Sequence, residues 1–286
     1  MSRRNSDRIG GHRESSTTPP VNAAPEGFSF VVPTEFVELP SGGKYYPEEH
    51  PLHGQDTVEI RHMTAKEEDI LTSRTLLQKG VALDRLVNNI VTDKRIVCND
   101  LLIGDRNAIV LAARISGYGP EYLTKVTCPT CLAEQRFSFD VSNPYIHNGG
   151  EFEDEEENQK SIAVGEGIFE TELPVTKFKV EFKILTVAEE KKYISGLEEG
   201  RKGNKQERNV TSQLMAMLHK VNNTELNEHK KYVVENLPSK DSRYLREVYR
   251  RTSPSVELLR DFECEKCGFE SRMEVPLSAD FFWPQS

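Results

Sequence analysis

The pattern of apolar and polar positions predicts short strands that alternate with helices. Residues 57–63 alternate as a half-buried strand does. Thr64 and Glu67 follow at the spacing of a capping box, which marks a helix start, and Gly80 ends this helix. Two more helices are predicted at about 83–91 and 105–117. The apolar positions of the first helix are Ile70, Leu71, Leu76 and Leu77.

The same order of features recurs later in the chain. Residues 180–190 match residues 58–68 as a strand followed by a capping box. Ten further residues, from Leu101 to Ser142, recur in order between Leu237 and Ser278, after a polar insertion at about 196–209. The repeated order indicates an internal duplication. The recurring residues are Leu101, Asp105, Arg114, Glu121, Leu123, Cys128, Cys131, Glu134, Arg136 and Ser142, which return as Leu237, Asp241, Arg250, Glu257, Leu259, Cys264, Cys267, Glu270, Arg272 and Ser278.

Each repeat carries one C-x-x-C motif in a turn between two strand-like runs. The motifs are Cys128–Cys131 and Cys264–Cys267. A C-x-x-C on a tight turn supplies half of a tetrahedral thiolate site, so two such turns supply a whole one. Soft thiolates at this spacing favour zinc, and four of them leave no open catalytic position. The sequence therefore predicts one structural zinc shared by Cys128, Cys131, Cys264 and Cys267.

Two other interpretations of the four cysteines stay open at this point. A redox dithiol of the thioredoxin type needs a strand-to-helix context, whereas strands follow here. Inert thiols, the remains of a lost site, are the second alternative. Gly268 follows the second motif as zinc knuckles prefer, but Leu132 follows the first. Cys98 has no partner at useful spacing and is interpreted as a small apolar residue.

These patterns predict an α+β protein of two duplicated modules, each with a strand, helices and a C-x-x-C β-hairpin, joined by a zinc-ribbon-like four-cysteine centre. The expected domains are a disordered tail at 1–27, a first module at 28–142, an acidic linker at 143–167 and a second module at 168–286. The tail is rich in polar residues and poor in large apolar ones. The acidic run is interpreted as a solvated linker, with a tether for a basic partner as the alternative.

Charge and hydropathy narrow the functional classes. The 286-residue chain has a formal net charge of -9 and a pI near 5.4, which argues against a dedicated nucleic-acid binder. Arg243, Arg246, Arg250 and Arg251 would make a local basic patch, although this spacing is more often a solvated helix face. We expect no membrane-spanning segment and no secretory signal. Four of the five cysteines stand in C-x-x-C motifs, which suits a reducing compartment better than a disulfide framework.

No motif indicates catalysis. The sequence lacks phosphate-binding glycine loops, the H-E-x-x-H zinc motif and the G-x-S-x-G elbow. His50 and His53 flank a loop and are interpreted as solvated rather than metal-binding. Paired acids such as Glu67 and Glu68 are explained by helix capping and the helix dipole. We therefore expect no enzyme. We expect Phe281, Phe282 and Trp283 to cover the core, with a docking peptide as the alternative.

Three features in this order resemble the T-even-type bacteriophage baseplate hub family: the segment 39–47 (LPSGGKYYP), the Thr64-x-x-Glu67-Glu68 helix start after a strand, and the C-x-x-C hairpin after an Asp-initiated helix. The resemblance implies a structural or assembly component of the baseplate hub of a contractile tail, without catalysis. It implies other baseplate or tail proteins as partners, assembly in the host bacterial cytoplasm and a place in the virion. The alternative function is a zinc-ribbon adaptor that acts on nucleic acid or transcription machinery.

Overall fold

The first half of the chain begins with two antiparallel strands that lie beside a long helix. In the computed structural model, which describes residues 31–202, 209–275 and 279–282, Val37 of the first strand pairs with Val58 of the second. Both side chains are buried, as alternation predicts. The predicted tail at 1–27 lies outside the described residues. The elements are β1 (Thr34–Glu38), β2 (Thr57–Arg61), α1 (Ala65–Thr72), α2 (Arg74–Gln78), α3 (Ala82–Ile90), the 3-10 helix η1 (Cys98–Asp100) and α4 (Ile103–Tyr118).

The helices begin where the sequence indicates, but the first is shorter than expected. Thr64 has extended backbone and caps α1, and its capping box with Glu67 is complete. The predicted helix up to Gly80 is broken at Ser73, whose extended backbone separates α1 from α2. Ser73 favours caps because its side chain competes for backbone hydrogen bonds. The described first half therefore contains more helices than the three predicted for it.

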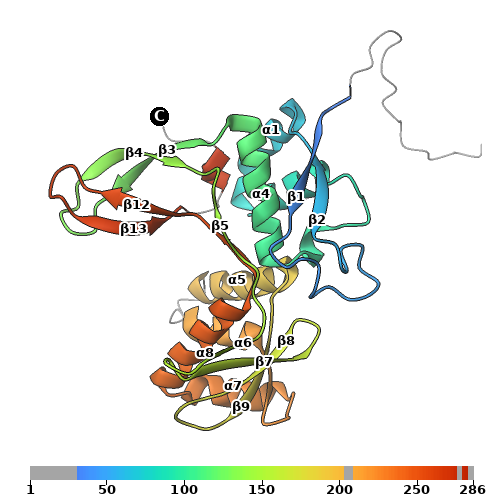
Figure 1. Ribbon diagram of the computed structural model, residues 1–286, viewed down its shortest axis with the longest axis vertical. Coiled ribbons are helices and arrows are strands. Elements are labelled where there is room, and N and C mark those ends of the chain that lie inside the picture. The colour runs from blue at the N-terminus through green and yellow to red at the C-terminus, as the bar shows by residue number, and fades with distance from the viewer. Residues whose placement is uncertain (1–30, 203–208, 276–278, 283–286) are drawn as a thin grey trace, which may run out of the picture. The chain divides into compact units, whose positions relative to one another are not determined.

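The second half also contains strands, helices and a hairpin, arranged around a larger sheet. Its hairpin β12–β13 lies beside β3–β4 of the first half (Figure 1). The described elements from the first hairpin onward are β3 (Glu121–Thr127), β4 (Glu134–Asp140), β5 (Tyr145–His147), β6 (Phe152–Asp154), β7 (Gln159–Gly165), β8 (Ile168–Glu172), β9 (Lys179–Lys183), α5 (Val187–Lys202), α6 (Asn209–Met217), β10 (Leu218–Val221), α7 (Asn227–Asn236), α8 (Ser239–Thr252), β11 (Ser255–Glu257), β12 (Leu259–Glu263), β13 (Glu270–Glu274) and the 3-10 helix η2 (Ala279–Phe282).

Residues 143–167 were predicted to be a solvated linker. This prediction is wrong as to structure, because much of the segment is strand. β6 and β7 extend the antiparallel sheet β10-β9-β8-β7-β6, and α8 packs against β7. Arg251 of α8 pairs with Asp154 and Glu157 at 3.0 and 3.2 Å. The same guanidinium lies 4.3 Å from the ring centroid of Phe152. These contacts offset part of the negative charge and hold the acidic segment on the fold.

The two halves are joined by backbone contacts independent of the cysteines. The N–H of Ile103 donates to Leu185 O, and the N–H of Val187 donates to Leu101 O. β5 of the first half pairs with β11 of the second. At Gly104, a Cβ would lie 2.2 Å from Pro254 O, so only glycine allows α4 to approach this backbone. The described residues from Pro33 onward accordingly form one compact unit.

Helix α4 anchors the end of the chain through a buried cation. Arg114 is 1% exposed, and its guanidinium donates to the carbonyls of Gly119, Glu121 and Phe281. Phe281 and Phe282 are fully buried, which confirms that they belong to the core. Trp283 lies outside the described residues. Within the described part of the chain, no helix combines the length and the apolar character needed to span a membrane.

Candidate metal centre

The four cysteines of the two motifs meet at the tips of the two hairpins. Cys128 Sγ lies 3.7 Å from Cys267 Sγ, and Cys131 Sγ lies 3.6 Å from Cys264 Sγ. All four sulfur atoms lie within 4.8 Å of one another. Each of these two contacts joins one hairpin to the other. The distances exclude sulfur–sulfur bonds, and all four cysteines are free.

Each turn holds its sulfur atoms with the same backbone hydrogen bonds. The N–H of Leu132 donates to Cys128 O in the first turn, and the N–H of Gly268 donates to Cys264 O in the second. The chain then turns through a left-handed residue, Leu132 with φ 56° and Gly268 with φ 67°. This conformation suits glycine and is uncommon for leucine. The two turns thus have one geometry despite the different residues noted in the sequence.

One side chain bridges the hairpins beside the sulfur atoms. The amide Nε2 of Gln135 on β4 donates to Glu263 O at 2.9 Å. Its Oε1 accepts from the N–H of Glu265 at 3.1 Å. Cys128 and Cys264 are buried. Gln135 therefore aligns the turns through contacts that involve no sulfur, a role that the sequence pattern did not indicate.

Cys128 and Cys267 differ in acidity because the Cys128 sulfur accepts hydrogen bonds from its neighbours. Burial opposes ionisation of Cys128, but backbone N–H groups of Cys131 and Thr130 and neighbouring thiols outweigh it and lower its pKa to about 6. For Cys267, the N–H of Phe269 favours the thiolate, whereas desolvation and the other three sulfurs together raise its pKa to about 12. The cluster therefore favours the thiolate at Cys128 over the thiolate at Cys267.

The donor set fits a closed tetrahedral zinc site. A zinc–sulfur bond of about 2.3 Å implies sulfur atoms roughly 3.8 Å apart in a regular tetrahedron. The two sulfur contacts between the hairpins, 3.6 and 3.7 Å, lie close to this spacing, and all four sulfur atoms lie within 4.8 Å of one another. A thioredoxin-type dithiol would need a helix after its motif, whereas β4 and β13 follow here. Four thiolates would fill the coordination shell, so such a metal would crosslink rather than activate substrate.

The remaining candidate residues lie away from this cluster. His50 stacks on Tyr46, and its Nδ1 accepts from the N–H of Leu52, so this histidine is part of a packed loop rather than fully solvated. Nδ1 of His53 lies 2.7 Å from Tyr46 O. Cys98 is buried, with its Sγ 3.7 Å from Asp84 Oδ1, and burial raises its pKa to about 12. These contacts assign all three residues to local packing.

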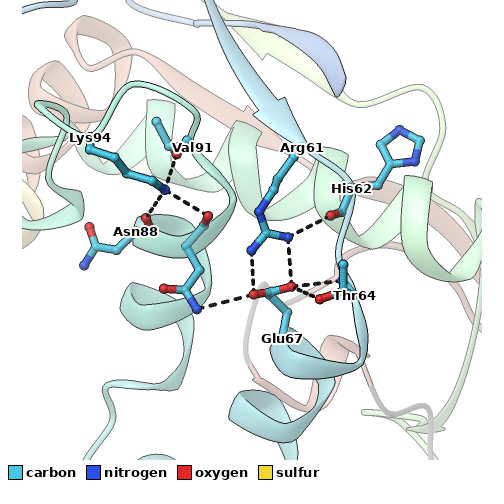
Figure 2. Close-up of polar contacts among 8 residues, drawn as sticks. Arg61, His62, Thr64, Glu67, Asn88, Val91 and Lys94 are labelled. Carbon is cyan, nitrogen blue, oxygen red and sulfur yellow. Dashed lines mark hydrogen bonds and ion pairs between the residues drawn. The ribbon is translucent and has the colours of Figure 1, made fainter. Parts of the chain in front are cut away.

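The helix start at Glu67 has a partner that the sequence reasoning missed. Figure 2 shows Arg61 from the end of β2 directed at the Glu67 carboxylate, with two contacts of 2.7 and 2.9 Å. Burial would raise the pKa of Glu67, but hydrogen bonds from Arg61 and from the Thr64 hydroxyl and backbone lower it to about 2. Asn89 of α3 also donates to Glu67. Glu67 therefore ties β2, α1 and α3 together.

The second half has an analogous contact. Lys183 at the end of β9 pairs with Glu189, which also accepts from the N–H of Thr186. A basic residue at the end of each strand would have been the sequence signal for both pairs. The contacts around Glu67 and around Glu189 stabilise the local fold, and they do not assemble a group of reactive side chains.

Comparison with known proteins gives one match. A profile of the family described as T4 bacteriophage base plate protein matches residues 32–283. No curated protein and no solved structure among those compared matches the chain significantly. The matched range includes both hairpins and all four clustered cysteines.

Proposed function

The chain belongs to the family of T4-type bacteriophage base plate proteins, and from this membership we propose that it is a non-catalytic structural or assembly component of the baseplate hub of a contractile tail. The observation that carries the proposal is the match over residues 32–283, which includes every described helix and strand. Its partners are then other baseplate or tail proteins. It assembles in the host cytoplasm and functions in the virion.

A structural zinc held by Cys128, Cys131, Cys264 and Cys267 is the second part of the proposal. The sulfur geometry and the closed, thiolate-only donor set support it. Because the two motifs come from opposite halves, the ion joins β3–β4 to β12–β13. When bound, zinc supplies a crosslink and no catalysis. Metal binding and folding are then coupled at the hairpin tips.

Internal duplication is the third part of the proposal, and the polar contacts of the two halves support it. Asp105 in the first turn of α4 accepts from Ser41 N and Oγ and from Tyr46 Oη, all on the β1–β2 connection. Asp241 in the first turn of α8 accepts from Val175 and Thr176 on the β8–β9 connection. In both halves, a buried carboxylate fastens the last long helix to the loop of a hairpin.

The test of the baseplate assignment is the protein content of phage particles. Mass spectrometry of gradient-purified particles and of tail-assembly intermediates measures the copy number of the chain in each. A hub subunit is present in finished particles, whereas an assembly factor is confined to intermediates. Absence from both fractions would contradict the proposal. Salt-dependent binding to generic DNA or RNA by the purified chain would instead favour the nucleic-acid adaptor.

A further inference from the structure

Strand β1 pairs with β2 along one edge and has an open edge on the other side. The N–H of His62 donates to Pro33 O at the start of the strand, which fixes the phase of the pairing. In an antiparallel pair, alternate residues turn their N–H and C=O groups toward the partner and away from it. The backbone groups of Thr34, Phe36 and Glu38 therefore point away from β2. All three residues are exposed, and these groups have no hydrogen-bond partner among the described residues.

Strand β8 of the second half corresponds to β1. Residues 38–40 (Glu-Leu-Pro) recur as residues 172–174, where β8 ends. The hydrogen bond at the start of the strand also has a counterpart, because the N–H of Ile184 donates to Gly167 O. β8 therefore pairs with β9 in the same phase as β1 pairs with β2. The comparison of the two strands rests on the duplication proposed above.

The edge of β8 that corresponds to the open edge of β1 carries another strand. β7 lies there, antiparallel to β8, with Ile162 opposite Glu170 (Figure 1). Continued by two residues, this register places Lys160 opposite Glu172. Helix α8, the counterpart of α4, packs against β7. The second half therefore accommodates a helix and an added strand together at this place.

Phe36 and Glu38 take the places that Glu170 and Glu172 have in β8. We infer that the open edge of β1 binds an extended segment of a partner protein, antiparallel to β1, with an apolar residue opposite Phe36 and a basic residue opposite Glu38. The Phe36 side chain is 71% exposed, so an apolar side chain opposite it would cover part of its ring. Main-chain hydrogen bonds to the edge supply affinity in this mode of binding, and the side chains supply specificity.

Two features of β1 favour a partner protein over this chain itself. The β7–β8 turn passes through Gly167 with φ 64°, whereas Pro33 stands at the corresponding position and its ring holds φ at about −65°. The chain before Pro33 therefore cannot return along β1 by the same tight turn. A second copy of β1 would bring Glu35 and Glu38 and no basic residue. In the second half, by contrast, Lys160 stands opposite the glutamate.

The sequence of β7 supplies the probe for this edge. A dye-labelled peptide with the sequence of residues 158–165 is titrated into the full chain, and its binding is followed by fluorescence anisotropy. We expect saturable binding that Glu38→Lys weakens at least about threefold, because like charges would then lie opposite each other. The same peptide with Lys160→Glu should reverse this order and prefer Glu38→Lys. Glu49→Lys makes the same change of charge at an exposed loop position and should bind like wild type.

Amide hydrogen exchange shows where the peptide binds. The amides of Phe36 and Glu38 should exchange fast in the free chain and at least about tenfold more slowly with saturating peptide. No binding by wild type, or equal weakening by Glu38→Lys and Glu49→Lys, would overturn the inference.

Protection of the β1 amides without peptide would also overturn it. Protection that is independent of protein concentration would mean that the chain covers its own edge, and protection that grows with concentration would mean a second copy. Because the assay involves neither phage particles nor the cysteine cluster, its failure leaves the baseplate and zinc proposals standing. The duplication also stands in that case, since the contacts of Asp105 and Asp241 support it independently.

Discussion

Leu132 and Gly268 have the same left-handed backbone at the same place after their C-x-x-C motifs, with φ of 56° and 67°. Leu132 is 74% exposed, so its side chain gains little from packing. Gly268 has open space around its Cβ direction. The two turns therefore differ mainly in conformational cost, which is about 1–2 kcal/mol for a residue with a Cβ.

Exchanging these residues tests that cost. Leu132→Gly should keep or raise the free energy of unfolding, by up to about 1 kcal/mol after the added entropy of glycine in the unfolded chain. Gly268→Leu should lower it by about 1–2 kcal/mol. Urea unfolding of the zinc-loaded protein measures both. A loss of stability in Leu132→Gly comparable to that in Gly268→Leu would show that Leu132 has a packing role instead.

Replacing Glu67 tests the cluster at the start of α1. Its side chain is 1% exposed and pairs with Arg61. Glu67→Gln should lower the free energy of unfolding by about 2–3 kcal/mol at neutral pH, because the change leaves Arg61 without its charge partner. Glu68→Gln, a neighbour outside the cluster, serves as the control and should change stability by less than about 0.5 kcal/mol.

The pH dependence of the Glu67 effect follows from the lowered pKa. The pKa of this carboxylate falls from 4.5 to about 2 on folding. The stabilisation is therefore complete above about pH 4.5 and is lost as the pH falls toward about 2. The difference between wild type and Glu67→Gln should shrink over that interval, measured by urea unfolding at each pH. A difference that stays constant down to the acid limit would contradict the assigned pKa.

The join between the halves can be tested at Gly104. Gly104→Ala should lower the free energy of unfolding by more than about 2 kcal/mol, because the added Cβ would lie 2.2 Å from Pro254 O and the backbones must separate. Gly165→Ala is the matched control, since its new Cβ would meet Ile168 at an ordinary 3.7 Å. Thermal unfolding by circular dichroism compares the two. Equal melting temperatures for both variants would mean that α4 adjusts without cost.

Arg114 and Arg250 occupy corresponding positions in the sequence repeat but make different contacts in the structure. Their variants can therefore be compared directly. Arg114→Met should lower the free energy of unfolding by about 3 kcal/mol, since three carbonyls lose the donor that the buried guanidinium supplies. It should also speed proteolysis after Phe281 and Phe282. Arg250→Met removes an exposed ion pair and should cost under about 1 kcal/mol. Slow proteolysis of the C-terminus in Arg114→Met would argue against its anchoring role.

Local patterns in the sequence predicted the α+β class, the strands that flank each motif and the capping box at Thr64. These features depend on neighbouring residues, which a single sequence displays. The strands of the acidic segment were not predicted. They are held in place by Arg251, about a hundred residues away in the chain, and by pairing with β8. Gln135 was missed for the same reason, since its role arises only from contacts across elements.

The metal content of the purified full-length chain tests the central claim of a shared zinc site most directly. Inductively coupled plasma mass spectrometry should find about one zinc per wild-type chain. Cys131→Ser and Cys267→Ser should lose the zinc and unfold at lower urea concentration, because ligand loss and destabilisation are linked. Wild-type protein without metal, with four titratable thiols and unchanged stability in both variants, would contradict the claim.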